Sequence, residues 1–134
     1  MKHYSCTDLA GVPDFRAAEY SEKSSEYCLL IPVINEGARI LTELGRACKA
    51  GIDRLCDIVV CDGGSTDGSM SNDILPTYGV NTLLVKTGPG KQGAQLRMGL
   101  YFALQRGYKG ILTIDGNNKD SIEDVPEFIE KLQQ

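Results

Sequence analysis

Two short apolar runs, each ending in an acidic turn that contains glycine, constrain this chain more than any other feature of its sequence. One run is Ile58–Cys61, followed by Asp62, and the other is Ile111–Ile114, followed by Asp115. β-branched apolar runs of this length predict buried strands, whereas Asp, Gly and Asn favour turns. Open α/β sheets bind their ligands beyond the carboxyl ends of the strands. The sequence therefore predicts a ligand site at the ends of these two strands.

Strand and helix patterns alternate along the chain. Strands are predicted at residues 27–34, 57–61, 80–85 and 109–114, and helices at 38–50, 69–78, 94–105 and after a capping signature at Ser121. In the third helix the predicted buried stripe is Leu96, Leu100, Ala103 and Leu104. Short connections between alternating elements imply a three-layer α/β fold, with a mostly parallel sheet and helices on both faces.

The N-terminal part of the chain is more polar than the rest. We interpret residues 1–26 as an extension in which Phe15, Ala17, Ala18 and Tyr20 form a short helix, and residues 27–134 as the folded domain.

Composition excludes some classes of function. The net charge of −4 argues against binding to nucleic acid, which depends on a basic surface. The longest apolar run, Cys28–Ile34, is too short to cross a bilayer, and no secretory signal is apparent. The five cysteines form no C-x-x-C pair, so we expect small buried side chains in a reducing, cytoplasmic protein.

Several polar segments could carry chemistry, and each has a purely structural alternative. Asp115 and Asn117 offer oxygen ligands to Mg or Mn, or they cap their own turn. Asp62 and Gly63 could meet a base or ribose, while Ser65–Asp67 could cap the next helix. The segment of residues 86–93 is either a phosphate-binding loop or a plain surface loop, and it is not a Walker A motif.

Three of these segments, together with residues 31–36, resemble the motifs of family 2 glycosyltransferases. Residues 31–36 resemble the P-x-Y-N-E opening and residues 59–69 the V-V-D-D-G-S-T-D-G-S turn. Residues 90–94 are similar to the G-K-G-x-A loop and residues 114–117 to the D-x-D motif. The resemblance covers residues 27–134 and is closest to the branch of polyprenyl-phosphate sugar synthases.

The resemblance implies the nucleotide-sugar-binding half of a GT-A fold. It would place Pro32, Ile34, Glu36 and Asp62 around the base and ribose, with Gly63 where many members carry a second Asp, and Lys91 beside the nucleotide. Asp115, Gly116 and Asn117 would lie at the ribose, the metal and the diphosphate, with Asp115 and Asn117 as ligands of Mg or Mn. The implied donor is a UDP- or GDP-sugar.

The same resemblance implies an acceptor, either a membrane-associated lipid phosphate or a glycan. The chain ends one helix beyond the D-x-D-like motif, so we expect a missing C-terminal half or a second copy to complete the acceptor site. Two alternatives stay open at this point. One is a non-catalytic nucleotide-binding or interaction module that kept the fold, and the other is a nucleotidyltransferase on a related sheet.

Overall fold

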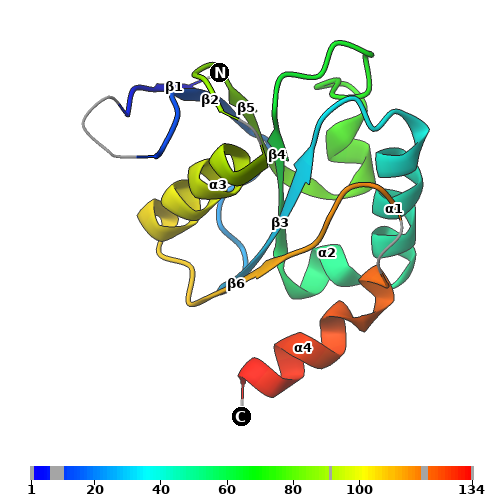
Figure 1. The fold of residues 1–134 in the computed structure, drawn as a ribbon. Helices are drawn as coiled ribbons and strands as arrows, with labels where there is room; N and C mark the ends of the chain where they lie inside the picture. Colours follow the sequence, from blue (N-terminus) through cyan, green and yellow to red (C-terminus); the bar gives the residue numbers. More distant parts are fainter. Residues whose placement is uncertain (1, 7–10, 91, 119–120, 134) are drawn as a thin grey trace.

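The described residues of the computed structural model (2–6, 11–90, 92–118 and 121–133) form a six-stranded sheet that helices cover on both faces (Figure 1). The strands are β1 (Lys2–Tyr4), β2 (Phe15–Glu19), β3 (Tyr27–Val33), β4 (Asp57–Asp62), β5 (Val80–Lys86) and β6 (Gly110–Thr113). The helices are α1 (Ala38–Lys49), α2 (Ile52–Leu55), α3 (Gln92–Arg106) and α4 (Val125–Leu132), with 3₁₀ turns η1 (Leu75–Tyr78) and η2 (Ile122–Asp124).

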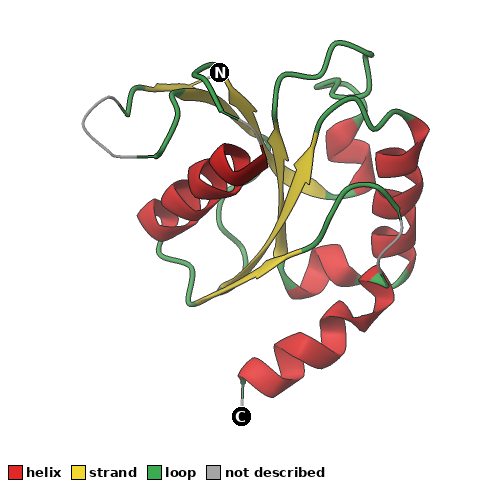
Figure 2. Cartoon of the chain, in the orientation of Figure 1, coloured by secondary structure: helices red, strands yellow, loops and turns green. Residues whose placement is uncertain are grey.

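The sheet has the order β1-β2-β5-β4-β3-β6, and its four strands from β5 to β6 are parallel. Helix α3 packs on one face, while α1, α2 and α4 cover the other (Figure 2). This arrangement confirms the predicted three-layer α/β fold with a mostly parallel sheet. It also brings the carboxyl ends of β3, β4 and β6 to the same edge.

Strand β3 is the centre of the core, and all seven of its residues are buried. Leu29 and Ile31 pack with the helices of one face, whereas Cys28 and Leu30 pack against α3 on the other. A strand covered on both faces must be apolar at every position, which explains the unbroken apolar run in the sequence.

The helix predicted between Phe15 and Tyr20 is wrong, because this segment forms strand β2. Its residues alternate between buried and exposed, with Phe15 and Ala17 inside and Arg16 outside. Strand β2 pairs antiparallel with β5, and β1 pairs antiparallel with β2, so both extend the sheet of the main domain.

The buried stripe predicted for α3 is also partly wrong. Ala103 is buried as expected, but Leu100 and Leu104 are 40% and 67% exposed, and Met98 and Phe102 face the sheet instead. The reason is a close approach at Gly99, where an added Cβ would lie 2.7 Å from the Sγ of Cys61. The helix is therefore turned so that its glycine, rather than its leucines, meets β4.

The helices predicted to begin at Ser69 and after Ser121 begin later in the structure. Between residues 69 and 78 only η1 is helical, because the Ser69 and Ser71 side chains make local hydrogen bonds that compete with helix formation. Ser121 makes no side-chain cap, and η2 precedes α4.

The five cysteines are free thiols, and four of them are buried. Burial raises the pKa of the Cys56 and Cys61 thiols to about 12, so both are inert packing residues. Within the described ranges, the helices are too short or too polar to serve as membrane spans.

The role of β2 in the core can be tested at Phe15. Its ring is fully buried and stacks on Tyr4, with 4.6 Å between the ring centroids. Phe15→Ala should lower the free energy of unfolding by about 3–5 kcal/mol, whereas exposed Arg16→Ala should change it by less than about 0.5 kcal/mol. Urea unfolding of both variants checks this. Equal stabilities would mean that the N-terminal strands do not belong to the folding unit.

Candidate functional site

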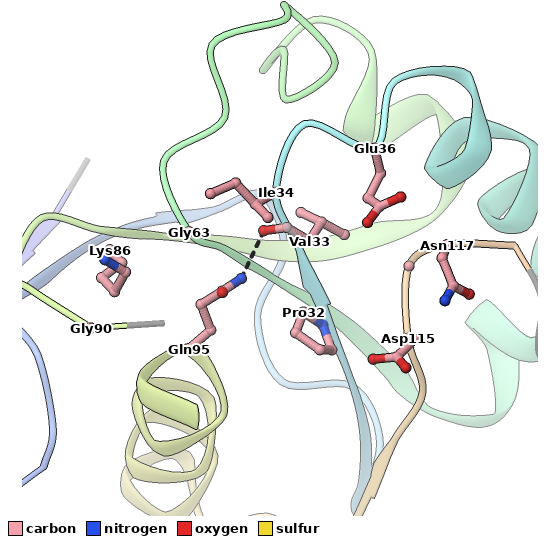
Figure 3. Close-up of a pocket in the computed structure, with 11 residues that line it drawn as sticks. Pro32, Val33, Ile34, Glu36, Gly63, Lys86, Gly90, Gln95, Asp115 and Asn117 are labelled. Carbon is pink, nitrogen blue, oxygen red and sulfur yellow. Dashed lines mark hydrogen bonds between the residues drawn. The ribbon is translucent and has the colours of Figure 1, made fainter. Parts of the chain in front are cut away.

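A cavity of about 420 Å³ lies at the carboxyl ends of the parallel strands, where the sequence predicted a site (Figure 3). Its walls come from the ends of β3 and β5, from the loops after β3, β4, β5 and β6, and from the start of α3. The lining residues are Pro32, Val33, Ile34, Glu36, Gly63, Lys86, Gly90, Gln95, Asp115, Gly116 and Asn117.

Hydrogen bonds fasten the loop after β3 to the loop after β4. The Asn35 backbone, which has a left-handed φ of 47°, donates to the Ser65 Oγ at 2.9 Å. In return, the Thr66 backbone N–H donates to the Asn35 Oδ1 at 2.8 Å. Asn tolerates this φ better than most residues, so Asn35 suits a position that must both turn the chain and hold its neighbour.

Asp67 completes this fastening from the second loop. Its carboxylate accepts a hydrogen bond of 3.0 Å from the backbone of Gly37, at the start of α1. Hydrogen bonds from the side chain and backbone of Ser69 are the main cause of its lowered pKa. The sequence suggested that a residue of this turn caps the next helix, but the helix start that Asp67 contacts is that of α1.

Asp62 does not line the cavity. It is buried, and both of its carboxylate oxygens accept hydrogen bonds from the backbone N–H of Ser65. The Ser65 hydroxyl adds a third bond to Oδ1, at 2.6 Å. Asp62 therefore shapes the glycine turn that borders the cavity.

Gln95 is the cavity residue that sequence reasoning missed. Its side chain is 3% exposed, and its amide nitrogen donates to the carbonyl oxygens of Val33 at 2.7 Å and Cys61 at 2.9 Å. A Cβ added to Gly63 would lie 2.9 Å from the Cδ of Gln95. The glycine at position 63 is thus required by space, because the Gln95 amide fills the place where another side chain would lie.

The residues after β6 form a second wall, which we call the acidic turn (residues 115–118). Ile114 and Gly116 donate backbone hydrogen bonds to the carbonyl oxygens of Leu30 and Pro32. An added Cβ on Gly116 would lie 2.4 Å from the Cγ1 of Val33, so this position also requires glycine. The contacts hold the acidic turn against β3, and Asp115 and Asn117 are among the residues that line the cavity (Figure 3).

The far end of the acidic turn is held by helix α1. Asn118, with φ at 62°, donates its backbone N–H to the Oε1 of buried Glu43 at 3.0 Å. Arg46 donates to the Asn118 Oδ1 at 2.6 Å, and it binds both carboxylate oxygens of Glu123, at 2.7 and 2.5 Å.

Two further charged side chains line the cavity, Glu36 from the loop after β3 and Lys86 from the end of β5. The carboxylate of Glu36 lies 3.0 Å from the Arg39 guanidinium. The Lys86 ammonium donates to the carbonyl oxygen of Gly88 at 2.9 Å. Lys91, which the resemblance places beside a nucleotide, lies outside the described residues.

The structure thus brings together most of the residues that the sequence singled out. Seven of them line one cavity: Pro32, Ile34, Glu36, Gly63, Asp115, Gly116 and Asn117. Among the described residues, no group of three or more His, Cys, Asp or Glu side chains is arranged to hold a metal ion. A cation in this cavity would therefore need further oxygen ligands, such as water or a bound phosphate.

Comparisons with known proteins give little further information. No protein-family model and no curated protein sequence matches this chain. Among solved structures, TarS from S. aureus is similar, with a TM-score of 0.49 and 25% sequence identity. The match covers 80% of this chain but only 20% of the TarS chain. The functional assignment therefore rests on the cavity and the motifs that line it.

The ion pair that supports the acidic turn should make stability depend on pH. Hydrogen bonds from Arg46 lower the pKa of Glu123 from its usual value of 4.5 to about 2. Because the pKa of Glu123 is lowered in the folded state, the ion pair contributes fully to the free energy of unfolding above pH 4.5. This contribution decreases as the pH falls towards 2. The difference in urea midpoint between wild type and Glu123→Gln should therefore shrink over this range. Exposed Glu130→Gln serves as the control, and a difference that is constant with pH would contradict the pairing.

Proposed function

We propose that this chain is the donor-binding domain of a family 2-like glycosyltransferase that holds a nucleoside diphosphate sugar in the cavity. One observation supports this proposal most. The four segments that resemble glycosyltransferase motifs are separated in sequence, yet each contributes residues to the same cavity, namely Glu36, Gly63, Gly90 and Asp115. Chance resemblance of four segments would not require them to meet.

The cavity has the size and the lining that a nucleotide needs. Its volume of about 420 Å³ falls within the usual range for small-molecule sites. Pro32 and Ile34 offer apolar walls for a base or ribose, while the backbone at Gly63 allows close approach. Asp115 and Asn117 line the cavity from the acidic turn, where they would face the diphosphate.

The ligand set fits a hard divalent cation, Mg or Mn. Asp115 supplies carboxylate oxygens and Asn117 an amide oxygen, both on the cavity wall. Mg is usually held by one or two carboxylates, with water and substrate phosphates as the other ligands. When bound, such an ion would offset the negative charge on the leaving diphosphate.

For the acceptor, we propose a polyprenyl phosphate, following the branch that the motifs resemble most. A phosphate acceptor is already anionic at neutral pH, so its attack on the sugar needs no general base. A glycan hydroxyl would need one. This difference makes the lipid phosphate the simpler partner for the residues that line the cavity.

A non-catalytic nucleotide-binding module is the second candidate. It is favoured by the lack of a three-residue acidic cluster among the described residues and by the amide at Asn117, where the D-x-D motif carries a second acid. Such a module would bind nucleotide without Mn and would not turn over a nucleotide sugar.

A thermal-shift panel tests the proposal. UDP, GDP, CDP and UDP-sugars are each added with and without Mn. The nucleotides that carry one particular base should raise the melting temperature in the presence of Mn. A ligand added at a hundred times its Kd stabilises the folded state by about 2.7 kcal/mol. Asp115→Ala should remove the Mn-dependent part, whereas Glu130→Ala, which changes an exposed acid outside the cavity, should keep it.

Turnover then separates the candidates. Release of nucleoside diphosphate from the selected sugar donor, in the presence of a polyprenyl phosphate in detergent, would support the transferase. Binding that needs no Mn and gives no turnover would support the non-catalytic module. A panel without any shift would contradict both, and pyrophosphate release from a nucleoside triphosphate and a sugar phosphate would indicate a nucleotidyltransferase.

A further inference from the structure

Helix α1 contributes two polar side chains that face the acidic turn rather than solvent or the cavity. Glu43 is fully buried, although a charged residue in a helix that packs on a sheet would ordinarily lie outside. Arg46, one turn further on, reaches the same segment. Neither residue is among those that line the cavity, so a contact with the ligand does not explain them.

The geometry explains them through Asn118. This residue has a φ of 62°, which an L-residue adopts at some cost unless its surroundings hold it there. Glu43 accepts the backbone N–H of Asn118 at 3.0 Å, and Arg46 binds its side-chain oxygen at 2.6 Å. Both the main chain and the side chain of Asn118 are therefore fixed to α1.

The preceding residues of the acidic turn are fixed differently, to strand β3. The Gly116 backbone N–H donates to the Pro32 carbonyl oxygen at 3.3 Å, and its Cα packs against Val33. Asn117 lies between these two fixed points, and Asp115 directly precedes the first. The contacts of these neighbours thus help to position the two proposed metal ligands.

Helix α1 also adjoins the cavity. It begins at Ala38, two residues after Glu36, which lines the cavity, and the preceding Gly37 is held by Asp67. One helix therefore connects Glu36 near its N-terminal end with the acidic turn through Glu43 and Arg46.

We propose that Glu43 and Arg46 are positioning residues that hold Asp115 and Asn117 in the geometry needed for a divalent cation and a nucleoside diphosphate. This inference rests on the proposed function. It predicts that changes at Glu43 or Arg46 weaken metal-dependent binding without removing any group that touches the ligand. Mutation of residues that orient metal ligands typically costs about 10–100-fold in metal affinity.

The test compares Glu43→Leu with Glu43→Gln. The leucine variant keeps an apolar side chain of similar size but has no acceptor, whereas the glutamine variant keeps an oxygen for the Asn118 N–H. We expect about tenfold weaker Mn affinity in the presence of UDP or GDP for Glu43→Leu, and near wild-type affinity for Glu43→Gln. Nucleotide affinity without Mn should change by less than about twofold, since the apolar wall is untouched.

A second measurement reports on the free protein. Hydrogen exchange at the Asn118 amide should be slow in the wild type and in Glu43→Gln and much faster in Glu43→Leu, because only the leucine variant lacks the acceptor. Arg46→Met, which changes a partly exposed side chain, provides a further variant if Glu43→Leu does not fold. It should lower Mn affinity in the same direction.

The outcomes separate this inference from the proposed function. If the wild type binds neither Mn nor nucleotide, both proposals are overturned. If the wild type binds both, but a folded Glu43→Leu or Arg46→Met variant binds Mn equally well, only the positioning role is overturned. Equal losses in Glu43→Leu and Glu43→Gln would also overturn it, because the buried charge rather than the hydrogen bond would then be responsible.

Discussion

The cavity depends on the paired hydrogen bonds that the Gln95 amide makes to the ends of β3 and β4. The amide nitrogen of Gln95 donates to the carbonyl oxygens of Val33 and Cys61, so the two strand ends and the start of α3 are joined. The Val33 carbonyl oxygen accepts a second hydrogen bond, of 2.9 Å, from the backbone N–H of Gly63. The same amide excludes any side chain at Gly63. The backbone of the second loop can therefore come close to whatever the cavity holds.

The acidic residues around this edge of the sheet form two groups, one that stabilises the loops and one that lines the cavity. Asp62, Asp67 and Glu43 accept hydrogen bonds from backbone N–H groups and fix the loops. Glu36 and Asp115 line the cavity instead. The first group is poorly placed to bind a ligand, because its members do not line the cavity. The two acids of the cavity wall are thus the better candidates for chemistry.

Periodicity in the sequence was sufficient to predict the parallel strands, their order along the chain and the sheet edge at which the cavity lies. It failed where a contact with a distant segment decided the outcome. A hydrophobic pattern assigns the leucines of α3 to the buried face. In the structure the helix approaches β4 so closely that Gly99, rather than the leucines, faces the strand. Gln95 near the start of a helix looks like an exposed residue, and only the strand ends explain its burial. For Asp62 the signal was present, because a serine three residues later is typical of a local Asp–Ser turn.

Charge balance bears on whether a cation takes part. A nucleoside diphosphate carries several negative charges, and two carboxylates line the cavity that we assign to it, with Lys86 as the described cation on its wall. Lys86 already donates to the Gly88 carbonyl oxygen, so its charge is directed partly towards its own loop. At short range and partly shielded from water, repulsion between carboxylate and phosphate is stronger than it would be in bulk solvent. A divalent ion between Asp115 and the diphosphate would turn this repulsion into attraction. On this charge balance we propose a metal-dependent donor site rather than a nucleotide site that works without metal.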